Sequence, residues 1–240
     1  MQLTPLSSTQ TLFTRDGNPL AVDANWFNPE FWLDQNKVFA QKTGRATAYF
    51  FAHKELKAVL RHYWRGGLVG KVLRDEYLYT SMRNTRVYQE FSLMCTLYQQ
   101  GLPVVEPIAA MVQKSGLIYR GDIITRALEG AVSLCERLVA EQLDETTITE
   151  IGVTIAQFHK SGVYHADLNI NNILFDKQNK VHVIDFDRGE IRPANTQWQQ
   201  QNMARLQRSF VKEATRQPHF HWSTQDWQTL EKAYQRAMAD

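Results

Sequence analysis

Cysteine is scarce in this sequence: its 240 residues include only Cys95 and Cys135. Both lie in stretches with helical periodicity, and two cysteines so far apart form neither a disulfide framework nor the spacing of a zinc site. We therefore expect two free thiols, which suits a protein of a reducing compartment such as the cytoplasm.

Long hydrophobic runs and excess charge are also missing. No run of about 18 apolar residues is present, so we expect no membrane-spanning helix, and the N-terminus lacks the basic start and apolar core of a signal peptide. The net charge of +2 is too small to indicate a nucleic-acid partner. No feature points to an obligate protein partner. A hydrophobic content of 43% instead indicates a globular chain, long enough for one domain or two closely packed lobes.

Two short apolar runs, Ile173–Phe175 and 181–184, flank five polar residues and predict a β-hairpin. In an antiparallel hairpin the first strand begins beside the end of the second, so Asn172 and Asp185 should lie together, with Asp167 on the preceding loop. Converging carboxylate and amide oxygens suit a hard cation such as Mg²⁺. The alternative is that these are ordinary turn residues, which Asp and Asn often are.

Residues 165–172 (HADLNINN) resemble the H-x-D-L-x-x-x-N catalytic loop of the protein-kinase-like superfamily. Residues 185–187 resemble its D-F-G motif. The resemblance implies that Asp167 orients or deprotonates an acceptor hydroxyl. It also implies that Asn172 and Asp185 bind ATP through Mg²⁺. His165 is expected to brace the loop, whereas Asp187, where glycine is usual, has no firm role.

The resemblance extends to the N-terminal half. Residues 37–51 predict two strands with Gly44 at the turn, where a glycine lets backbone N–H groups approach nucleotide phosphates; an ordinary hairpin turn is the alternative. A strand over residues 56–63 has Arg61 where the superfamily has the lysine that contacts these phosphates. The arginine guanidinium is planar and forked and has a different reach from the compact lysine ammonium, so Lys57 and Lys71 remain alternatives for the phosphate contact.

Glu90 lies in the middle of the apolar stripe of a helix predicted over residues 81–100. A buried carboxylate needs a positive partner, and Arg61 is the natural candidate. Alternatively, Glu90 lies at the edge of the stripe and extends to water. Strands are expected over 102–109 and 116–125, and residues 125–128, from Thr125 to Leu128, occupy the place of the adenine-binding hinge by resemblance.

Positive charge gathers between residues 57 and 86, where seven basic residues against two acidic ones give a local charge of +5. Such a stretch suits anionic lipid head groups or phosphorylated sugars, and we predict that Arg65, Lys71 and Arg74 contact the substrate. A solvated basic loop is the alternative. Arg205 and Arg208, on a helix predicted near the C-terminus, offer a second docking site for an anionic acceptor.

The second lobe is expected to be short. A helix with a capping box at residues 147–150 should end at Gly162, and only two further helices fit into residues 186–240. No long activation segment is visible, and Asn169 replaces the lysine that protein kinases place two residues after the catalytic aspartate. The acceptor is therefore expected to be a small molecule or lipid and not a protein.

Residues 37–212 resemble the lipopolysaccharide core kinases, most clearly at residues 60–68 (LRHYWRGGL) and 202–210 (NMARLQRSF). The resemblance implies ATP-dependent phosphorylation of a hydroxyl, the 4-OH, of 3-deoxy-D-manno-octulosonic acid (Kdo) on a Kdo–lipid A acceptor. It also implies a peripheral protein on the cytoplasmic face of the bacterial inner membrane.

The sequence thus predicts an α+β, protein-kinase-like bilobal fold in a single domain over residues 1–240. A small antiparallel-sheet N-lobe would span about residues 1–125 and a reduced, mostly helical C-lobe residues 126–240. One alternative is a kinase of another small molecule, such as an antibiotic phosphotransferase, against which the basic stretch argues. Another is a non-catalytic kinase-like scaffold that binds nucleotide or membrane, which the presence of Asp167, Asn172 and Asp185 disfavours.

Overall fold

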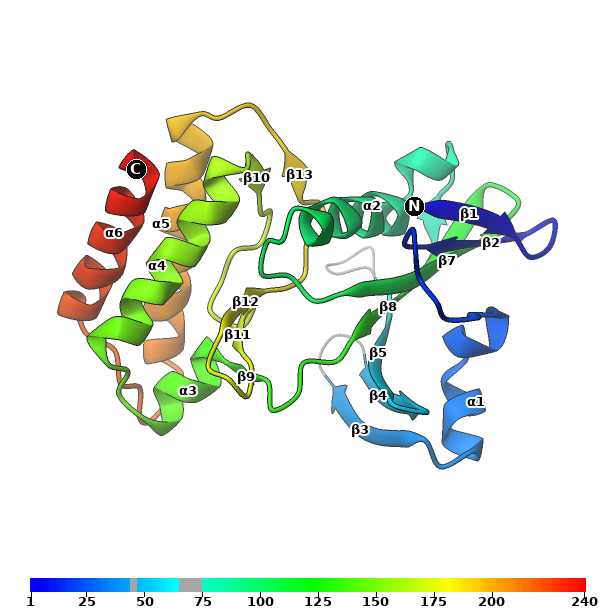
Figure 1. The fold of residues 1–240 in the computed structure, drawn as a ribbon, viewed down its shortest axis with the longest axis horizontal. Coiled ribbons are helices and arrows are strands. Elements are labelled where there is room, and N and C mark those ends of the chain that lie inside the picture. Colours follow the sequence, from blue (N-terminus) through cyan, green and yellow to red (C-terminus); the bar gives the residue numbers. More distant parts are fainter. Residues whose placement is uncertain (44–46, 65–74) are drawn as a thin grey trace. The chain divides into compact units, whose positions relative to one another are not determined.

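A computed structural model of the chain describes residues 1–43, 47–64 and 75–240. The chain divides into two compact units. Unit 1 comprises Met1–Tyr98 and Val105–Ala127, and unit 2 comprises Gln99–Val104 and Leu128–Asp240. Antiparallel strands dominate unit 1 and helices dominate unit 2 (Figure 1), which is the predicted α+β class. The limits of a single domain whose lobes meet near residue 125 stay a prediction.

Unit 1 is built on an antiparallel sheet of strand order β1-β2-β7-β8-β5-β4-β3, with β6 paired to β8. Alternate residues of β5 are buried, as expected of a strand that packs on one face. The strands are β1 (Gln2–Pro5), β2 (Gln10–Thr14), β3 (Val38–Thr43), β4 (Thr47–His53), β5 (Leu56–His62), β6 (Tyr77–Leu78), β7 (Pro107–Ser115) and β8 (Ile118–Arg126).

Helix α2 (Arg86–Gln99) packs on this sheet, where the Val87 side chain lies against Gly121 of β8. Short helical turns complete the unit: η1 (Ala24–Phe27), α1 (Pro29–Asp34) and η3 (Met82–Asn84). The aromatic residues around η1 and α1 fill the core, and the Trp32 ring stacks on Phe51 at 4.1 Å between centroids.

One strand was predicted in the wrong place. Strand β7 begins at Pro107 and not at residue 102, and the Gly116 turn, with φ of 60°, separates it from β8. The preceding segment belongs to unit 2, where Val104 forms a parallel bridge with Val183. Apolar residues around Pro103 therefore pair with a different sheet, which their hydrophobic pattern does not reveal.

Unit 2 is mostly helical. Its helices are α3 (Leu134–Ala140), α4 (Glu145–Lys160), α5 (Thr196–Ala214) and α6 (Thr224–Ala239), and its strands are β9 (Val132–Ser133), β10 (Val163–Tyr164), β11 (Ile173–Phe175), β12 (Val181–Val183) and β13 (Glu190–Ile191). Helices α4 and α6 pack so closely that a methyl group added at Gly152 would lie 2.4 Å from the Leu230 carbonyl oxygen.

The start of α4 differs from the prediction. Asp144 is the N-cap, and its carboxylate accepts a hydrogen bond from the Thr147 backbone N–H at 2.7 Å. This hydrogen bond lowers the pKa of Asp144. The predicted capping box began at Thr147 and was wrong, because the earlier Asp144 begins the helix almost one turn sooner.

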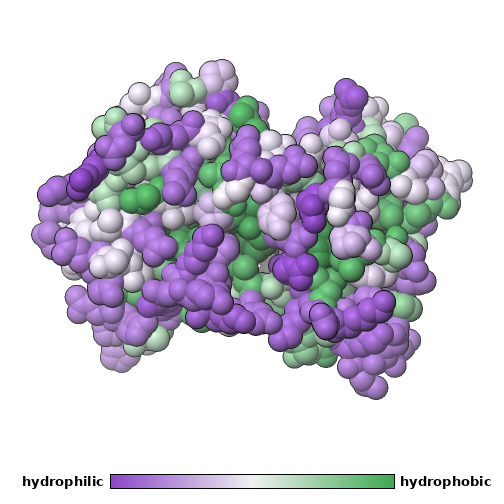
Figure 2. All heavy atoms as spheres, in the orientation of Figure 1, coloured by the Kyte–Doolittle hydropathy of each residue, from purple (hydrophilic) through white to green (hydrophobic). Residues whose placement is uncertain are grey.

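Hydrophilic residues predominate on the face of the molecule shown in Figure 2. Cys95 and Cys135 are both buried and form no disulfide with each other. Within the part of the chain that the structure describes, no helix is both long and apolar enough to span a lipid bilayer.

Candidate active site

The predicted hairpin is present in unit 2. Strands β11 and β12 pair antiparallel with Ile173 opposite Val183, and the Ile184 N–H donates to the Asn172 carbonyl oxygen at 2.9 Å. Asn172 and Asp185 therefore lie at the open end of the hairpin, as the sequence predicted.

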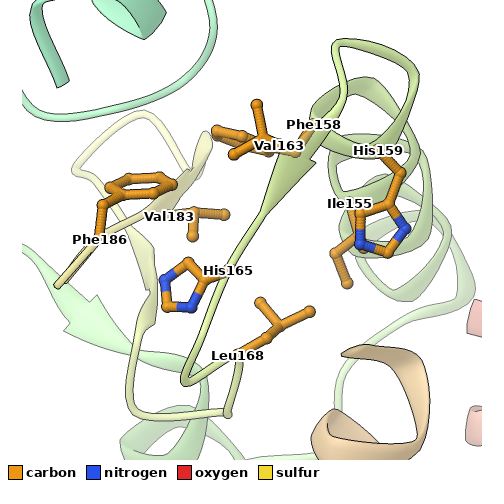
Figure 3. Close-up of a pocket in the computed structure, with 8 residues that line it drawn as sticks. All are labelled: Ile155, Phe158, His159, Val163, His165, Leu168, Val183 and Phe186. Atoms are coloured by element: carbon orange, nitrogen blue, oxygen red, sulfur yellow. The ribbon is translucent and has the colours of Figure 1, made fainter. Parts of the chain in front are cut away.

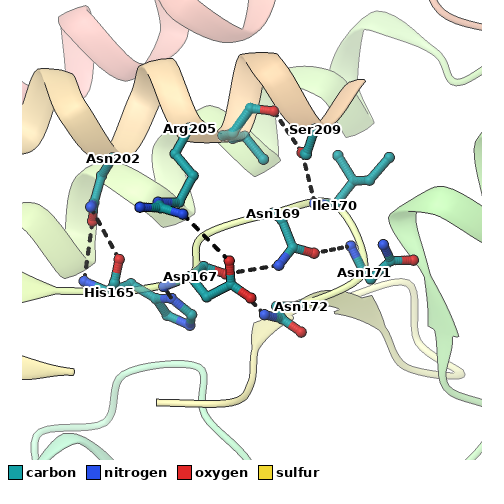
Figure 4. A network of polar contacts seen from close by, with 10 residues as sticks. His165, Asp167, Asn169, Ile170, Asn171, Asn172, Asn202, Arg205 and Ser209 are labelled. Carbon is teal, nitrogen blue, oxygen red and sulfur yellow. Dashed lines mark hydrogen bonds and ion pairs between the residues drawn. The ribbon is translucent and has the colours of Figure 1, made fainter. Parts of the chain in front are cut away.

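Asn172 links this hairpin to the loop that carries Asp167. Its side-chain N–H donates to the Asp167 carbonyl oxygen at 2.9 Å, and so does the side-chain N–H of Asn169, also at 2.9 Å (Figure 4). With the Asn172 amide nitrogen engaged, its Oδ1 is the side-chain atom that can bind a cation. The Asp167 carboxylate remains accessible, with 53% of the side chain exposed.

Asp185 has φ of 65°, in the left-handed region. This conformation is uncommon for a residue with a Cβ, and it occurs in turns as well as at active sites. Asp185 and Asn172 offer a carboxylate and an amide oxygen, and Mg²⁺ bound with nucleotide takes few protein ligands because phosphate oxygens and waters supply the rest. No cluster of three or more His, Cys, Asp or Glu able to hold a metal occurs in the described residues. The donor set thus fits Mg²⁺ bound together with phosphates.

His165 braces the loop, as predicted. Its Nδ1 accepts a hydrogen bond from the Asp167 N–H at 3.1 Å, so the Nε2, 3.0 Å from the Ile184 carbonyl oxygen, is the donor. Burial lowers the pKa of His165, which keeps the ring neutral in this arrangement. One side chain thereby joins the backbone beside Asp167 to the backbone beside Asp185.

An apolar pocket lies behind the loop (Figure 3). It is lined by Ile155, Phe158, His159, Val163, His165, Leu168, Val183 and Phe186. Burial also lowers the pKa of His159, to about 4, and its Nδ1 lies 2.8 Å from the Tyr234 hydroxyl. The apolar lining makes this pocket part of the support behind the loop and unsuited to phosphates.

In unit 1, Arg61 and Glu90 form the predicted ion pair, with 2.6 Å between Arg61 Nη2 and Glu90 Oε1. The Glu90 side chain is fully buried, so the alternative in which it extends to water is wrong. The Tyr63 hydroxyl donates to the second carboxylate oxygen, a partner that the sequence reasoning missed. The contact of Arg61 with nucleotide phosphates stays a prediction.

The remaining predicted site residues have varied positions. Thr125 is buried on β8 opposite Val59, and Leu128 lies just beyond the strand. Gly44, Arg65, Lys71 and Arg74 lie outside the described residues. Arg205, expected to dock the acceptor, lies on α5 with Nη1 3.7 Å from Asp167 Oδ1.

Sequence reasoning missed the groups of α5 that hold the loop. The Asn202 side chain forms two hydrogen bonds with the His165 backbone, and the Ser209 hydroxyl accepts one from the Ile170 N–H. The available signal was an asparagine at an inward position of an otherwise apolar helix stripe, where a buried amide needs a partner.

A second missed cluster lies in unit 1. His62 Nδ1 is 2.7 Å from an Asp122 carboxylate oxygen and its Nε2 is 3.2 Å from Asp75. Burial acts to lower the pKa of His62, but hydrogen bonds and charges from the two carboxylates outweigh it, so the pKa is raised. The cluster therefore favours a charged histidine at the end of β5, the strand that also carries Arg61.

Comparison with known proteins connects this geometry with a family. The sequence is 41% identical over 232 residues to a 3-deoxy-D-manno-octulosonic acid kinase of Actinobacillus succinogenes, covering 93% of this chain and 95% of the relative. A protein of the same name from Vibrio parahaemolyticus is 42% identical, over 86% of this chain and 86% of its own length. Another, from Haemophilus influenzae, is 38% identical, over 87% of this chain and 89% of its own length.

The sequence model of the lipopolysaccharide kinase (Kdo/WaaP) family matches residues 29–234. This match, with the sheet of unit 1 and the helices of unit 2, confirms the predicted kinase-like α+β fold class. The chain belongs to the lipopolysaccharide kinase (Kdo/WaaP) family.

Proposed function

We propose that this protein transfers the γ-phosphoryl group of ATP to a hydroxyl, the 4-OH, of Kdo in a Kdo–lipid A acceptor. The family membership and the relatives named 3-deoxy-D-manno-octulosonic acid kinase support the substrate. The observation that carries the chemistry is the meeting of Asp167, Asn172 and the strained Asp185 around one hairpin. This constellation belongs to phosphoryl transfer from a nucleotide.

In the transfer, the acceptor oxygen forms a bond to the γ-phosphorus while the bond from that phosphorus to the β,γ-bridging oxygen breaks. The leaving oxygen departs with ADP, and the acceptor proton passes to the Asp167 carboxylate, which is exposed enough to meet a substrate. Asn172 and Asp185 would hold Mg²⁺, which offsets the negative charge of the phosphates. The protein contributes mainly positioning and charge, as phosphoryl transfer requires.

In this proposal Arg61 contacts the ATP phosphates, with Lys57 and Lys71 as alternatives. Two hydrogen-bonded partners of Glu90, Arg61 and Tyr63, restrict the rotamers of that carboxylate, and Glu90 in turn fixes the guanidinium. About one-third of the Arg61 side chain stays exposed, so a ligand can reach it. Gly44 and residues 125–128 complete the nucleotide site as proposed from resemblance.

The acceptor carries carboxylate and phosphate groups, so we include Arg65, Lys71 and Arg74 as its docking residues. A protein that acts on a lipid-borne sugar must reach the membrane surface, and a basic stretch attracts anionic head groups. The proposal therefore includes peripheral association with the cytoplasmic face of the inner membrane. Neutralising these three residues together should raise KM for lipid-borne acceptor, more strongly at low salt.

The decisive experiment is incubation of the purified chain with γ-labelled ATP, Mg²⁺ and a panel of acceptors. The panel contains Kdo–lipid A, lipid A without Kdo, free Kdo and an aminoglycoside, and the Asp167→Ala variant is the inactive control. We expect label only on Kdo-containing acceptors and none with the variant. Label on the aminoglycoside alone, or none on any acceptor, would overturn the proposal.

A further inference from the structure

Helix α5 presents polar side chains at positions 202, 205 and 209 to the catalytic loop (Figure 4). Residues three to four positions apart lie on one face of a helix. At the first position, Asn202 accepts a hydrogen bond from the His165 N–H and donates one to the His165 carbonyl oxygen, both at 3.1 Å. Because Asn202 is almost completely buried, this clamp sits in a low-dielectric environment and holds the start of the loop firmly.

Ser209 holds the other side of the loop. Its hydroxyl accepts a hydrogen bond from the Ile170 N–H at 3.1 Å and donates to the Leu206 carbonyl oxygen at 2.6 Å. The helix is therefore attached to the backbone of the loop both before and after Asp167. Any side chain of α5 between these two attachments is held at a fixed register relative to Asp167.

Arg205 is that side chain, with its Nη1 3.7 Å from Asp167 Oδ1. The side chains are 44% and 53% exposed, so the pair contributes little to stability. The neighbouring Asn169 carries no charge, and its amide is occupied by the Asp167 carbonyl oxygen and the Asn171 N–H. Arg205 thus brings positive charge to the carboxylate from a separate helix.

Resting on the proposed phosphoryl transfer, we propose that Arg205 is a positioning residue that holds the Asp167 carboxylate toward the acceptor hydroxyl. An exposed carboxylate otherwise samples several rotamers, and only one of them points at the reacting oxygen. A misplacement of about 1 Å at a reacting centre costs about 100-fold in rate. Arg205 therefore has a function in turnover that the weak contribution of its ion pair to stability conceals.

This inference differs from docking of the acceptor by Arg205, which the sequence alone suggested. A docking residue lost to substitution raises KM for the acceptor, whereas a positioning residue lost to substitution lowers kcat. The two roles therefore separate in steady-state kinetics, provided that both substrates are varied.

The test compares Arg205→Ala and Arg205→Lys with the wild type, and Lys212→Ala serves as the matched control. Lys212 is an exposed cation seven residues further along the same helix, thus on the same face but two turns away. We expect Arg205→Ala to lower kcat by about 10- to 100-fold without changing KM for ATP or the melting temperature. Arg205→Lys should keep part of the activity, and Lys212→Ala all of it.

Chemical rescue adds a readout that a purely structural role would not move. Guanidinium ion at millimolar concentration should restore part of the kcat of Arg205→Ala and leave Asp167→Ala inactive. Unchanged kcat in Arg205→Ala, an effect confined to KM for the acceptor, or a lowered melting temperature without rescue would each overturn the inference.

Failure of this inference is distinguishable from failure of the proposed function. If the wild type phosphorylates Kdo–lipid A but Arg205→Ala matches it, only the role of Arg205 is wrong. If the wild type phosphorylates a different acceptor, the proposed substrate is wrong, and the kcat comparison is made on that acceptor instead.

Discussion

The two units hold their candidate site residues in opposite ways. In unit 1, Glu90 is fully buried in a helix and bound directly to Arg61 on a strand. In unit 2, Asp167 stays more than half exposed on a loop, and other residues, His165 and Asn202, hold the backbone around it. In unit 1, the ion pair thus both stabilises the fold and positions the Arg61 guanidinium. In unit 2, the side chain proposed for the chemistry and the side chains that hold the loop are different residues.

This difference indicates which substitutions should change stability and activity together and which should change activity alone. Removing a buried charge takes away a contact on which the surrounding packing depends, so folding and function suffer together. Removing an exposed carboxylate from a loop that is held by its backbone affects the chemistry alone. Four substitutions, in order of decreasing expected effect, break or sharpen this comparison.

Asp167→Ala should lower turnover by about 10²- to 10⁴-fold, the usual contribution of a positioned general base. MgATP binding should persist, because Asn172 and Asp185 are unchanged, and the free energy of unfolding should move by no more than about 0.5 kcal/mol. The measurements are kcat with the preferred acceptor, nucleotide affinity by calorimetry and urea unfolding. Wild-type turnover would refute the role of Asp167. A large loss of stability would refute the expectation that this substitution affects activity without affecting folding.

Glu90→Ala should lower the free energy of unfolding by about 3–5 kcal/mol, because Arg61 and the Tyr63 hydroxyl lose their carboxylate. Nucleotide affinity should fall as well, since the guanidinium is no longer held.

The matched control for Glu90→Ala is Arg120→Ala, which removes two more exposed ion pairs of unit 1, with Glu76 at 2.8 Å and with Asp75 at 2.9 Å. With 47% of the Arg120 side chain exposed, the loss should stay below about 1 kcal/mol. Equal losses in the two variants, measured by urea unfolding, would show that burial does not distinguish the ion pair of Glu90 from those of Arg120.

His159→Gln should change the pH dependence of stability. The pKa of His159 is about 4 in the folded protein and 6.5 in a model peptide, so below pH 6.5 the unfolded chain binds a proton that the folded chain does not. As the pH falls from 6.5 to 4, this histidine lowers the free energy of unfolding by about 3 kcal/mol. The variant lacks that contribution, so its free energy of unfolding, measured with urea at several pH values, should change less steeply with pH between 6.5 and 4. Identical slopes would contradict the prediction.

Gly152→Ala should destabilise unit 2 by about 1–3 kcal/mol, although alanine favours helices by about 1 kcal/mol over glycine. The added methyl group would lie 2.4 Å from the Leu230 carbonyl oxygen and force α4 and α6 apart. Gln157→Ala, at an exposed position of α4, is the control and should change stability by less than about 0.5 kcal/mol. A stabilised Gly152→Ala variant would mean that helix propensity prevails over the close packing.

The sequence predicted well where pattern and local chemistry coincide. The hairpin at Asn172, the buried position of Glu90 and the brace by His165 follow from strand alternation, helix periodicity and the rule that buried polar groups need partners. It failed for the cap of α4, where two acceptable caps lie three residues apart, and for residues 102–105, whose strand partner lies far along the chain.

By itself, then, the sequence determined the candidate residues for the chemistry, because carboxylates and amides at fixed spacings around a hairpin are a local property of the chain. Only the tertiary structure decided what holds them. Arg205 contacts Asp167 across 38 positions, and Asn202 reaches His165 across 37. Such contacts arise from the packing of a helix against a loop, and no periodicity along the sequence specifies their partners.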